Sequence, residues 1–236
     1  MTDVSLQTLL ETGAHFGHQI RRWNPKMKPY IYQGEEGVHI FDLLITKQAL
    51  EEALGVIKKA SKEGKNILII GTKKQVKEKI AQIAKETNIL YVNERWLGGT
   101  LTNFEQVKKS IDKLEKMKID KEAGTYKNLT KKERLLIDRE IVRLERFFGG
   151  LSGMNVRPDL MIIIDIKKEI GAAKEANFTG IETVGIVDSN ADPDLVDYAV
   201  PMNDDAKKAL DYVLDLIKDA ILEGKSKPNT KELKSK

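Results

Sequence analysis

The sequence predicts an α/β protein with a mainly parallel, doubly wound sheet of about five strands. Short apolar runs alternate with amphipathic helical patterns along most of the chain, an order typical of parallel sheets covered by helices. The run at 161–164, Met-Ile-Ile-Ile, is apolar at every position, which suits a strand buried on both faces. One long interruption, near the middle of the chain, has a different helical pattern and predicts an inserted unit.

The first 64 residues predict a short helix, a small β-ribbon and a long helix. Residues 5–10 read as a helix with Ser5 as its N-cap. Two β-prone runs, 30–32 and 38–41, are separated by a polar, Gly-containing connection, which indicates a hairpin. Apolar residues then recur at helical spacing over 46–64.

The alternation that defines the sheet follows. We expect strands at 66–70, 89–92, 160–164, 183–187 and 198–200, with helices at 73–86, 168–177 and 204–222.

The interruption predicts an antiparallel helical hairpin. Apolar residues recur there at alternating three- and four-residue steps in two narrow seams, which are typical of coiled coils: Phe104, Val107, Ile111 and Leu114, then Ile137, Ile141, Leu144 and Phe148. The alternative is that both helices pack flat on the sheet. We therefore expect an α/β body at 1–100 and 150–223, a coiled-coil hairpin at 101–149, and a disordered Lys-rich tail at 224–236.

Composition excludes several classes of protein. The 236 residues contain no Cys, so a disulfide framework, thiolate metal ligands and a Cys nucleophile are excluded. The start of the chain does not resemble a signal peptide, and no apolar run reaches the length of a membrane span. We expect a cytoplasmic protein with no membrane partner.

Charge is distributed unevenly along the chain. The net charge is +4, but the expected tail alone carries five Lys against one Glu, so the rest is neutral overall. A local basic segment holds Arg21, Arg22, Lys26 and Lys28 without an acid, whereas residues 188–219 contain nine Asp. The acidic stretch is a solvated face, or else the stretch or the hairpin is a docking surface for a protein.

Sequence motifs for catalysis are missing. The turn after the first predicted sheet strand, Gly71-Thr72-Lys73-Lys74, fits neither the dinucleotide nor the Walker spacing, so no small-molecule substrate or cofactor is expected. His15 and His18 share a short segment, but a stable zinc site needs three or four protein ligands. They are weak metal candidates, and we expect no metal.

RNA binding is the function that the residues favour. Basic side chains can contact phosphates, and tryptophans can stack on unpaired bases or, for the second one, fill the core. Around Gly98 and Gly99 the backbone can approach a partner closely. The candidates for RNA contact are Arg21, Arg22, Trp23, Asn24, Lys26, Lys28, Lys73, Lys74, Arg95, Trp96 and Asn103.

Four ordered motifs closely resemble the bacterial small-subunit ribosomal protein S-two family, over residues from about 5 to 222. They are HFGHQ at 15–19 with RRWNPKMKPY at 21–30, RWLGGTLTN at 95–103, PDL at 158–160 leading to Asp165, and IVDSN at 186–190 leading to Pro193. Departures from the family pattern are Ile170, where His is frequent, and Glu182, where Pro is frequent.

This resemblance implies a Rossmann-like, flavodoxin-like body with an inserted coiled-coil hairpin. It also implies a structural role in the small ribosomal subunit, with rRNA, the S-one protein and neighbouring small-subunit proteins as partners. Two other classes stay open on the sequence: an enzyme on a doubly wound sheet, which would bind a small ligand, and an adaptor that binds only proteins through its hairpin.

Overall fold

The computed structural model describes residues 4–226. Its centre is a sheet of five parallel strands in the order β5-β4-β6-β7-β8. The strands are β4 (Ile67–Ile70), β5 (Leu90–Val92), β6 (Leu160–Ile164), β7 (Glu182–Val187) and β8 (Tyr198–Pro201). The predicted parallel sheet is confirmed, with every strand within one residue of its expected bounds.

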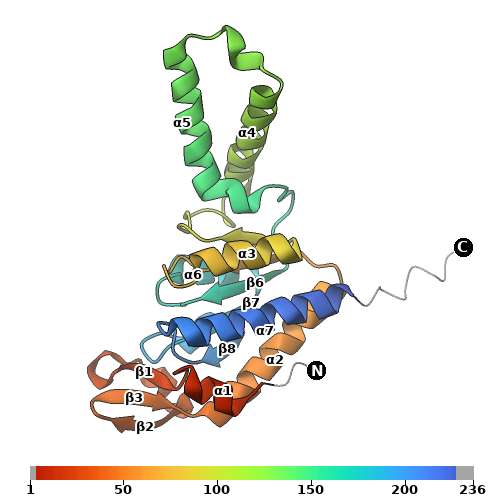
Figure 1. Ribbon diagram of the computed structural model, residues 1–236. Coiled ribbons are helices and arrows are strands. Elements are labelled where there is room, and N and C mark those ends of the chain that lie inside the picture. The colour runs from red at the N-terminus through yellow and green to blue at the C-terminus, as the bar shows by residue number, and fades with distance from the viewer. Residues whose placement is uncertain (1–3, 227–236) are drawn as a thin grey trace, which may run out of the picture.

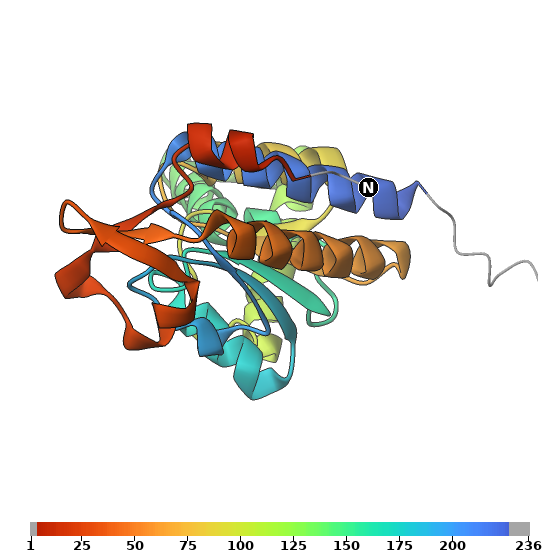
Figure 2. The ribbon, with the colours of Figure 1, turned by 90° about the horizontal axis from the view of Figure 1, so that it is seen from below.

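Helices cover both faces of the sheet (Figures 1 and 2). Side chains alternate along β4: Ile67 and Ile69 pack with helices of one face, and Leu68 and Ile70 with the other. The first face is covered by α1 (Leu6–Glu11), α2 (Leu43–Lys62), α3 (Lys77–Thr87) and α7 (Lys207–Lys225). The opposite face is covered by α6 (Ile170–Thr179) and by the loop that follows β5.

The strand order places a switch point beside β4. The crossover from β4 to β5 runs to one side of β4, and the next crossover, from β5 to β6, returns to its other side. Ligands of such sheets bind outside the carboxyl ends of the strands at this point. The loops after β4 and β6 are therefore where a small-molecule site would lie.

A three-stranded antiparallel ribbon lies beside the body. Its order is β1-β3-β2, with β1 (Phe16–Gln19), β2 (Ile31–Glu35) and β3 (Val38–Phe41). The sequence predicts the β2–β3 hairpin but not β1, whose Phe-Gly-His-Gln has no alternating apolar pattern. Two short 3-10 helices, Ile20–Arg22 and Pro25–Tyr30, connect β1 to β2.

Two antiparallel helices project from the body, α4 (Phe104–Glu122) and α5 (Lys131–Phe148) (Figure 1). The predicted seam residues Val107, Ile111 and Leu114 of α4 are buried with Ile141, Leu144 and Phe148 of α5. They join the core of the sheet face that holds Leu68. The coiled-coil character of this pair and its standing as a separate domain stay predictions.

Several helix ends differ from expectation. The Asp42 carboxylate caps α2 by accepting from the Leu44 N–H (2.9 Å), so this helix begins three residues before 46. Helix α3 begins at Lys77, not 73, because residues 73–76 form a turn. The expected tail from 224 overlaps α7, which continues to Lys225, and residues 227–236 lie outside the described residues. Within 4–226 no helix combines the length and apolarity that crossing a bilayer requires.

Candidate nucleic-acid interface

The basic segment, residues 21–28, is fixed to the body by its own backbone. Asn24 donates its backbone N–H to the Ser189 carbonyl (2.7 Å), and its side chain accepts from the Lys26 N–H (3.1 Å). The Met27 side chain is fully buried. The segment is therefore a preordered platform, although its outer side chains are polar.

The four cations of this segment differ in what they contact. Arg21, Arg22 and Lys28 are exposed, and the described part of the chain offers none of them an ion pair. Lys26 instead lies between the carboxylates of Asp192 and Asp194, each 2.8 Å from its Nζ. Three of the four predicted cations are free to contact a polyanion, and Lys26 is neutralised.

Trp23 packs on a histidine. Its ring centroid lies 4.9 Å from that of His39, with the planes tilted by 37°. Burial lowers the pKa of His39, whose two ring nitrogens have no hydrogen-bond partner among the described atoms. The histidine is therefore neutral at pH 7, and one face of the half-buried Trp23 is occupied.

The second predicted cluster, residues 93–103, is organised by Glu175 of α6. Its carboxylate accepts from the Trp96 indole N–H (3.0 Å) and from the backbone N–H groups of Gly99 (2.8 Å), Leu101 (3.0 Å) and Thr102 (3.2 Å). Sequence reasoning missed Glu175, because nothing in its own helix pattern points to a loop more than 70 residues away.

The three RNA-contact residues predicted in this loop differ in burial. Trp96 is 9% exposed and belongs to the core, which is the alternative that the sequence left open. Arg95 and Asn103 are exposed, and the Asn103 side chain does not cap α4. Glycine is required at position 99, where φ is +91°. Arg95 and Asn103 remain available to a partner.

Lys73 lies in an ionic cluster at the carboxyl edge of the sheet. Its Nζ lies 3.0 Å from Asp165, 2.5 Å from Asp204 and 2.7 Å from Asp205. Burial lowers the pKa of Lys73. The three carboxylates, of which Asp204 has the largest effect, raise this pKa by more than burial lowers it, so the net shift is upward. The predicted phosphate contact of Lys73 is disfavoured by these internal partners, whereas Lys74 is exposed.

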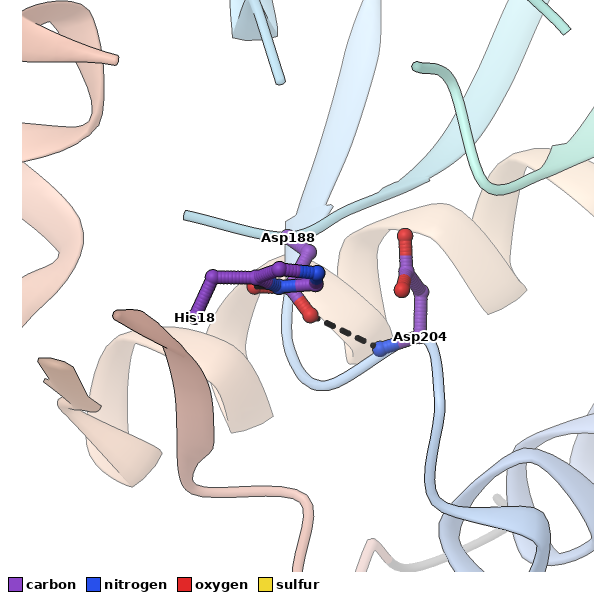
Figure 3. A group of neighbouring side chains, drawn as sticks. All are labelled: His18, Asp188 and Asp204. Carbon is purple, nitrogen blue, oxygen red and sulfur yellow. Dashed lines mark hydrogen bonds and ion pairs between the residues drawn. The ribbon is translucent and has the colours of Figure 1, made fainter. Parts of the chain in front are cut away.

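His18 extends the same cluster (Figure 3). Its Nδ1 lies 3.0 Å from Asp188, and hydrogen bonding to this carboxylate raises the pKa of His18. Burial and the Asp188 carboxylate raise the pKa of Asp204 to about 8. Ligand atoms of His18, Asp188 and Asp204 lie within 4.8 Å of one another, a donor set that could hold a divalent cation.

The other weak metal candidate, His15, is not part of that group. It packs on Phe16, with ring centroids 4.0 Å apart, and burial lowers its pKa. The sequence pointed to the pair His15 and His18, but the fold groups His18 with carboxylates that follow β7 and β8.

The place where a doubly wound enzyme binds its ligand is thus filled by internal ion pairs. Lys73 and Asp165 lie on the two sides of the switch point and contact each other. Exposed cations lie instead on the anchored basic segment and on the loop before the hairpin. Fold and site together define a binding protein on a doubly wound scaffold.

Comparison with known proteins gives the family. The chain belongs to the family described as "Ribosomal protein S2", whose family model matches residues 9–224. It is similar to the "Small ribosomal subunit protein uS2" of Coprothermobacter proteolyticus, at 45% identity over 225 residues, 95% of this chain and 84% of that protein. The protein of the same name from Petrotoga mobilis is 47% identical over 225 residues, 95% of this chain and 78% of the relative.

The resemblance drawn from the four motifs is therefore confirmed. The protein is a structural, non-enzymatic constituent of the small ribosomal subunit, and its partners belong to that particle.

Proposed function

We propose that the chain binds small-subunit rRNA through Arg21, Arg22 and Lys28 of the basic segment and through Arg95 and Asn103 of the loop before the hairpin. The observation that carries this proposal is that the three cations of the segment are exposed without an acidic partner in the described residues. Exposed cations without acidic partners are suited to phosphate contacts, which position a protein on RNA.

The anchoring of the segment supports the same proposal. Met27 and the Asn24 backbone hold the segment in place before any ligand arrives, so little backbone entropy is lost on binding. The face of the Trp23 ring that His39 does not cover adds a surface on which a base can stack. Lys26 and Lys73 contribute less, because their charges are matched by aspartates.

The test neutralises the three free cations together, as Arg21→Gln, Arg22→Gln and Lys28→Gln. Each lost phosphate contact reduces the magnitude of the slope of log affinity against log salt by about 0.9. The slope for rRNA binding by the triple variant should therefore be smaller than that of wild type by about 2.7. A matched control changes three exposed lysines of other surfaces, Lys174, Lys207 and Lys208, to Gln.

The same variants are followed in a cell lysate sedimented with magnesium. Co-migration with small subunits should be reduced for the basic-segment variant and kept by the control. Equal losses in both variants would contradict a localised site, and salt-independent binding of rRNA would contradict phosphate contact altogether.

We also propose that the S-one protein docks on an apolar groove between α1, the ribbon and the start of α2. The groove measures about 470 Å³ and is lined by Leu6, Leu10, Tyr32, Phe41 and Leu44 among others. Three of these side chains are strongly exposed: Leu10 by 54%, Tyr32 by 70% and Leu44 by 62%. Clustered exposed apolar side chains favour a protein partner over RNA.

The acidic stretch is the less favoured docking surface. Of its nine Asp, all but Asp211 and Asp219 make a hydrogen bond or ion pair within the described residues. Its negative charge is thus largely matched inside the body.

The docking proposal is tested by Leu10→Gln with Leu44→Gln, measuring how much S-one protein sediments with small subunits. The control, Val156→Gln with Phe178→Gln, alters two apolar side chains of similar exposure elsewhere (58% and 83%). S-one protein should be lost only from particles with the groove variant. Its retention there would overturn the proposed site.

A further inference from the structure

The projecting helices carry an excess of positive charge. Residues 104–149 contain 13 basic and nine acidic residues, a net charge of +4. With the five Lys and one Glu of residues 224–236 also set aside, the rest of the chain has 22 basic and 26 acidic residues, a net charge of −4. A polyanion is therefore drawn to the hairpin and repelled by most of the body.

Charges of opposite sign are sorted between the two sides of α5. All four acids of this helix are used internally: Glu133 forms the capping box with Thr130, and three carboxylates pair with lysines of α4. These pairs are Lys121 with Asp138, Lys113 with Glu140, and Lys118 with Glu145.

The side of α5 turned away from α4 has no acid. At 100° per residue, the residues opposite the buried seam of Ile141 and Leu144 are Lys132, Leu135, Arg139, Val142, Arg143 and Arg146, which we call the outer face of α5. All six are exposed. Arg143 forms an ion pair with Glu140, which also pairs with Lys113, and Arg146 forms one with Glu94. Lys132 and Arg139 have no ion pair in the described residues.

The corresponding side of α4 provides an internal comparison. Its exposed residues alternate in sign, with Lys109 and Lys116 interspersed with Glu105 and Asp112. Mixed charges of this kind are typical of a solvated helix. The uniform sign of the outer face of α5 is therefore not a general property of the hairpin.

We propose that the outer face of α5 lies along the backbone of a base-paired rRNA segment. Lys132, Arg139 and Arg146 follow one another at seven-residue steps, about 10 Å each along the helix. The face has no aromatic side chain to stack on unpaired bases, so it fits duplex RNA, which is recognised by shape and phosphate contacts. This inference rests on the proposed rRNA binding and adds a second contact, on a different element from the basic segment.

The two apolar residues of the face do not favour a protein partner instead. Leu135 and Val142 are separated by Arg139 and are exposed by 49% and 68%. Single exposed apolar side chains are normal on protein surfaces. An acidic helix of another protein is the competing occupant, and the experiment below distinguishes it.

The experiment compares Lys132→Gln with Arg139→Gln against the matched pair Lys109→Gln with Lys116→Gln on α4, in the full chain. Gln retains helix propensity, and both variants lose the same charge. The probe is an RNA duplex of about 20 base pairs with no sequence taken from rRNA. Binding is measured over a range of salt concentrations, and circular dichroism checks the helical content of each variant.

The slope of log affinity against log salt should fall by about 1.8 for the α5 variant and stay unchanged for the α4 variant. Equal effects of both variants would overturn the assignment to one face. Unchanged duplex binding by the α5 variant would also overturn the proposed RNA contact. If that variant were nevertheless lost from small subunits, the outer face of α5 would bind a protein partner instead. The basic-segment variant, measured in parallel on rRNA, separates the outcomes: if it retains full binding, the proposed function itself fails.

Discussion

The indole N–H of Trp96 donates a hydrogen bond to the Glu175 carboxylate across 3.0 Å, although 79 positions separate the two residues in the chain. The same carboxylate also accepts three backbone N–H groups of the loop that leads into α4. Burial raises the pKa of Glu175, but these hydrogen bonds lower it more, so the net shift is downward. The geometry of the loop is therefore linked to the ionised form of one side chain.

Glu175→Gln should destabilise the protein by about 2 kcal/mol at pH 7, because an amide cannot accept all of these hydrogen bonds. A lowered pKa in the folded state gives stability that is present above the pKa of the unfolded chain and is lost as pH falls through the folded value. The difference between variant and wild type should therefore shrink below about pH 4. Urea unfolding at several pH values measures it.

The control for this prediction is Glu122→Gln, which removes an equal charge from an exposed position of α4. It should leave the free energy of unfolding within about 0.5 kcal/mol of wild type at every pH. A Glu175→Gln difference that stays constant with pH would contradict the assigned role of the carboxylate.

The loop also illustrates how far sequence reasoning reaches. The motif at 95–103 correctly indicated a special connection between a strand and the hairpin, but both readings of Trp96 stayed open. Burial depends on what packs over a side chain, and here that includes α6, which is encoded far downstream. Local pattern therefore located the loop, and only the tertiary fold assigned its tryptophan to the core.

Lys73 and Lys74 are equivalent in the sequence and different in the fold. Lys73 compensates buried carboxylates that follow β6 and β8, more than 90 positions away, whereas Lys74 is exposed. Lys73→Met should destabilise the protein by about 3–5 kcal/mol, since it leaves the buried Asp165 carboxylate without its cation. Lys74→Met should change stability by less than about 0.5 kcal/mol. Equal unfolding midpoints in urea for the two variants would contradict the ionic cluster.

Two helical glycines predict opposite effects of the same substitution. A Cβ at Gly224 of α7 would lie 2.6 Å from the Ser61 Cβ and 2.7 Å from the Lys58 carbonyl, whereas at Gly55 of α2 it would meet nothing within 4 Å. Gly224→Ala should destabilise by about 1–3 kcal/mol through overpacking. Gly55→Ala should stabilise by about 0.5–1 kcal/mol, because Ala favours the helix. Thermal unfolding measures both, and stabilisation by Gly224→Ala would contradict the close packing of α7 on α2.

The acidic stretch shows a further limit of the sequence. Nine Asp between 188 and 219 indicated an acidic surface, solvated or used for docking. Asp188, Asp204 and Asp205 instead contact His18 or Lys73, and Asp192 and Asp194 contact Lys26. Charge counted along a chain ignores cations that the fold brings close. The basic and acidic patches, which seemed independent, partly neutralise each other.

That neutralisation can be reversed. Asp192→Asn with Asp194→Asn should free Lys26, and Asn at 192 can still cap the short helix that begins at Pro193. If the basic segment binds rRNA phosphates, one more free cation should steepen the slope of log affinity against log salt by about 0.9. The matched control, Asp211→Asn with Asp219→Asn, removes the same charge from carboxylates that have no ion pair in the described part of α7. This control variant should bind rRNA more tightly only because its net charge is more positive. An equal increase in slope for both variants would show that Lys26 makes no phosphate contact of its own.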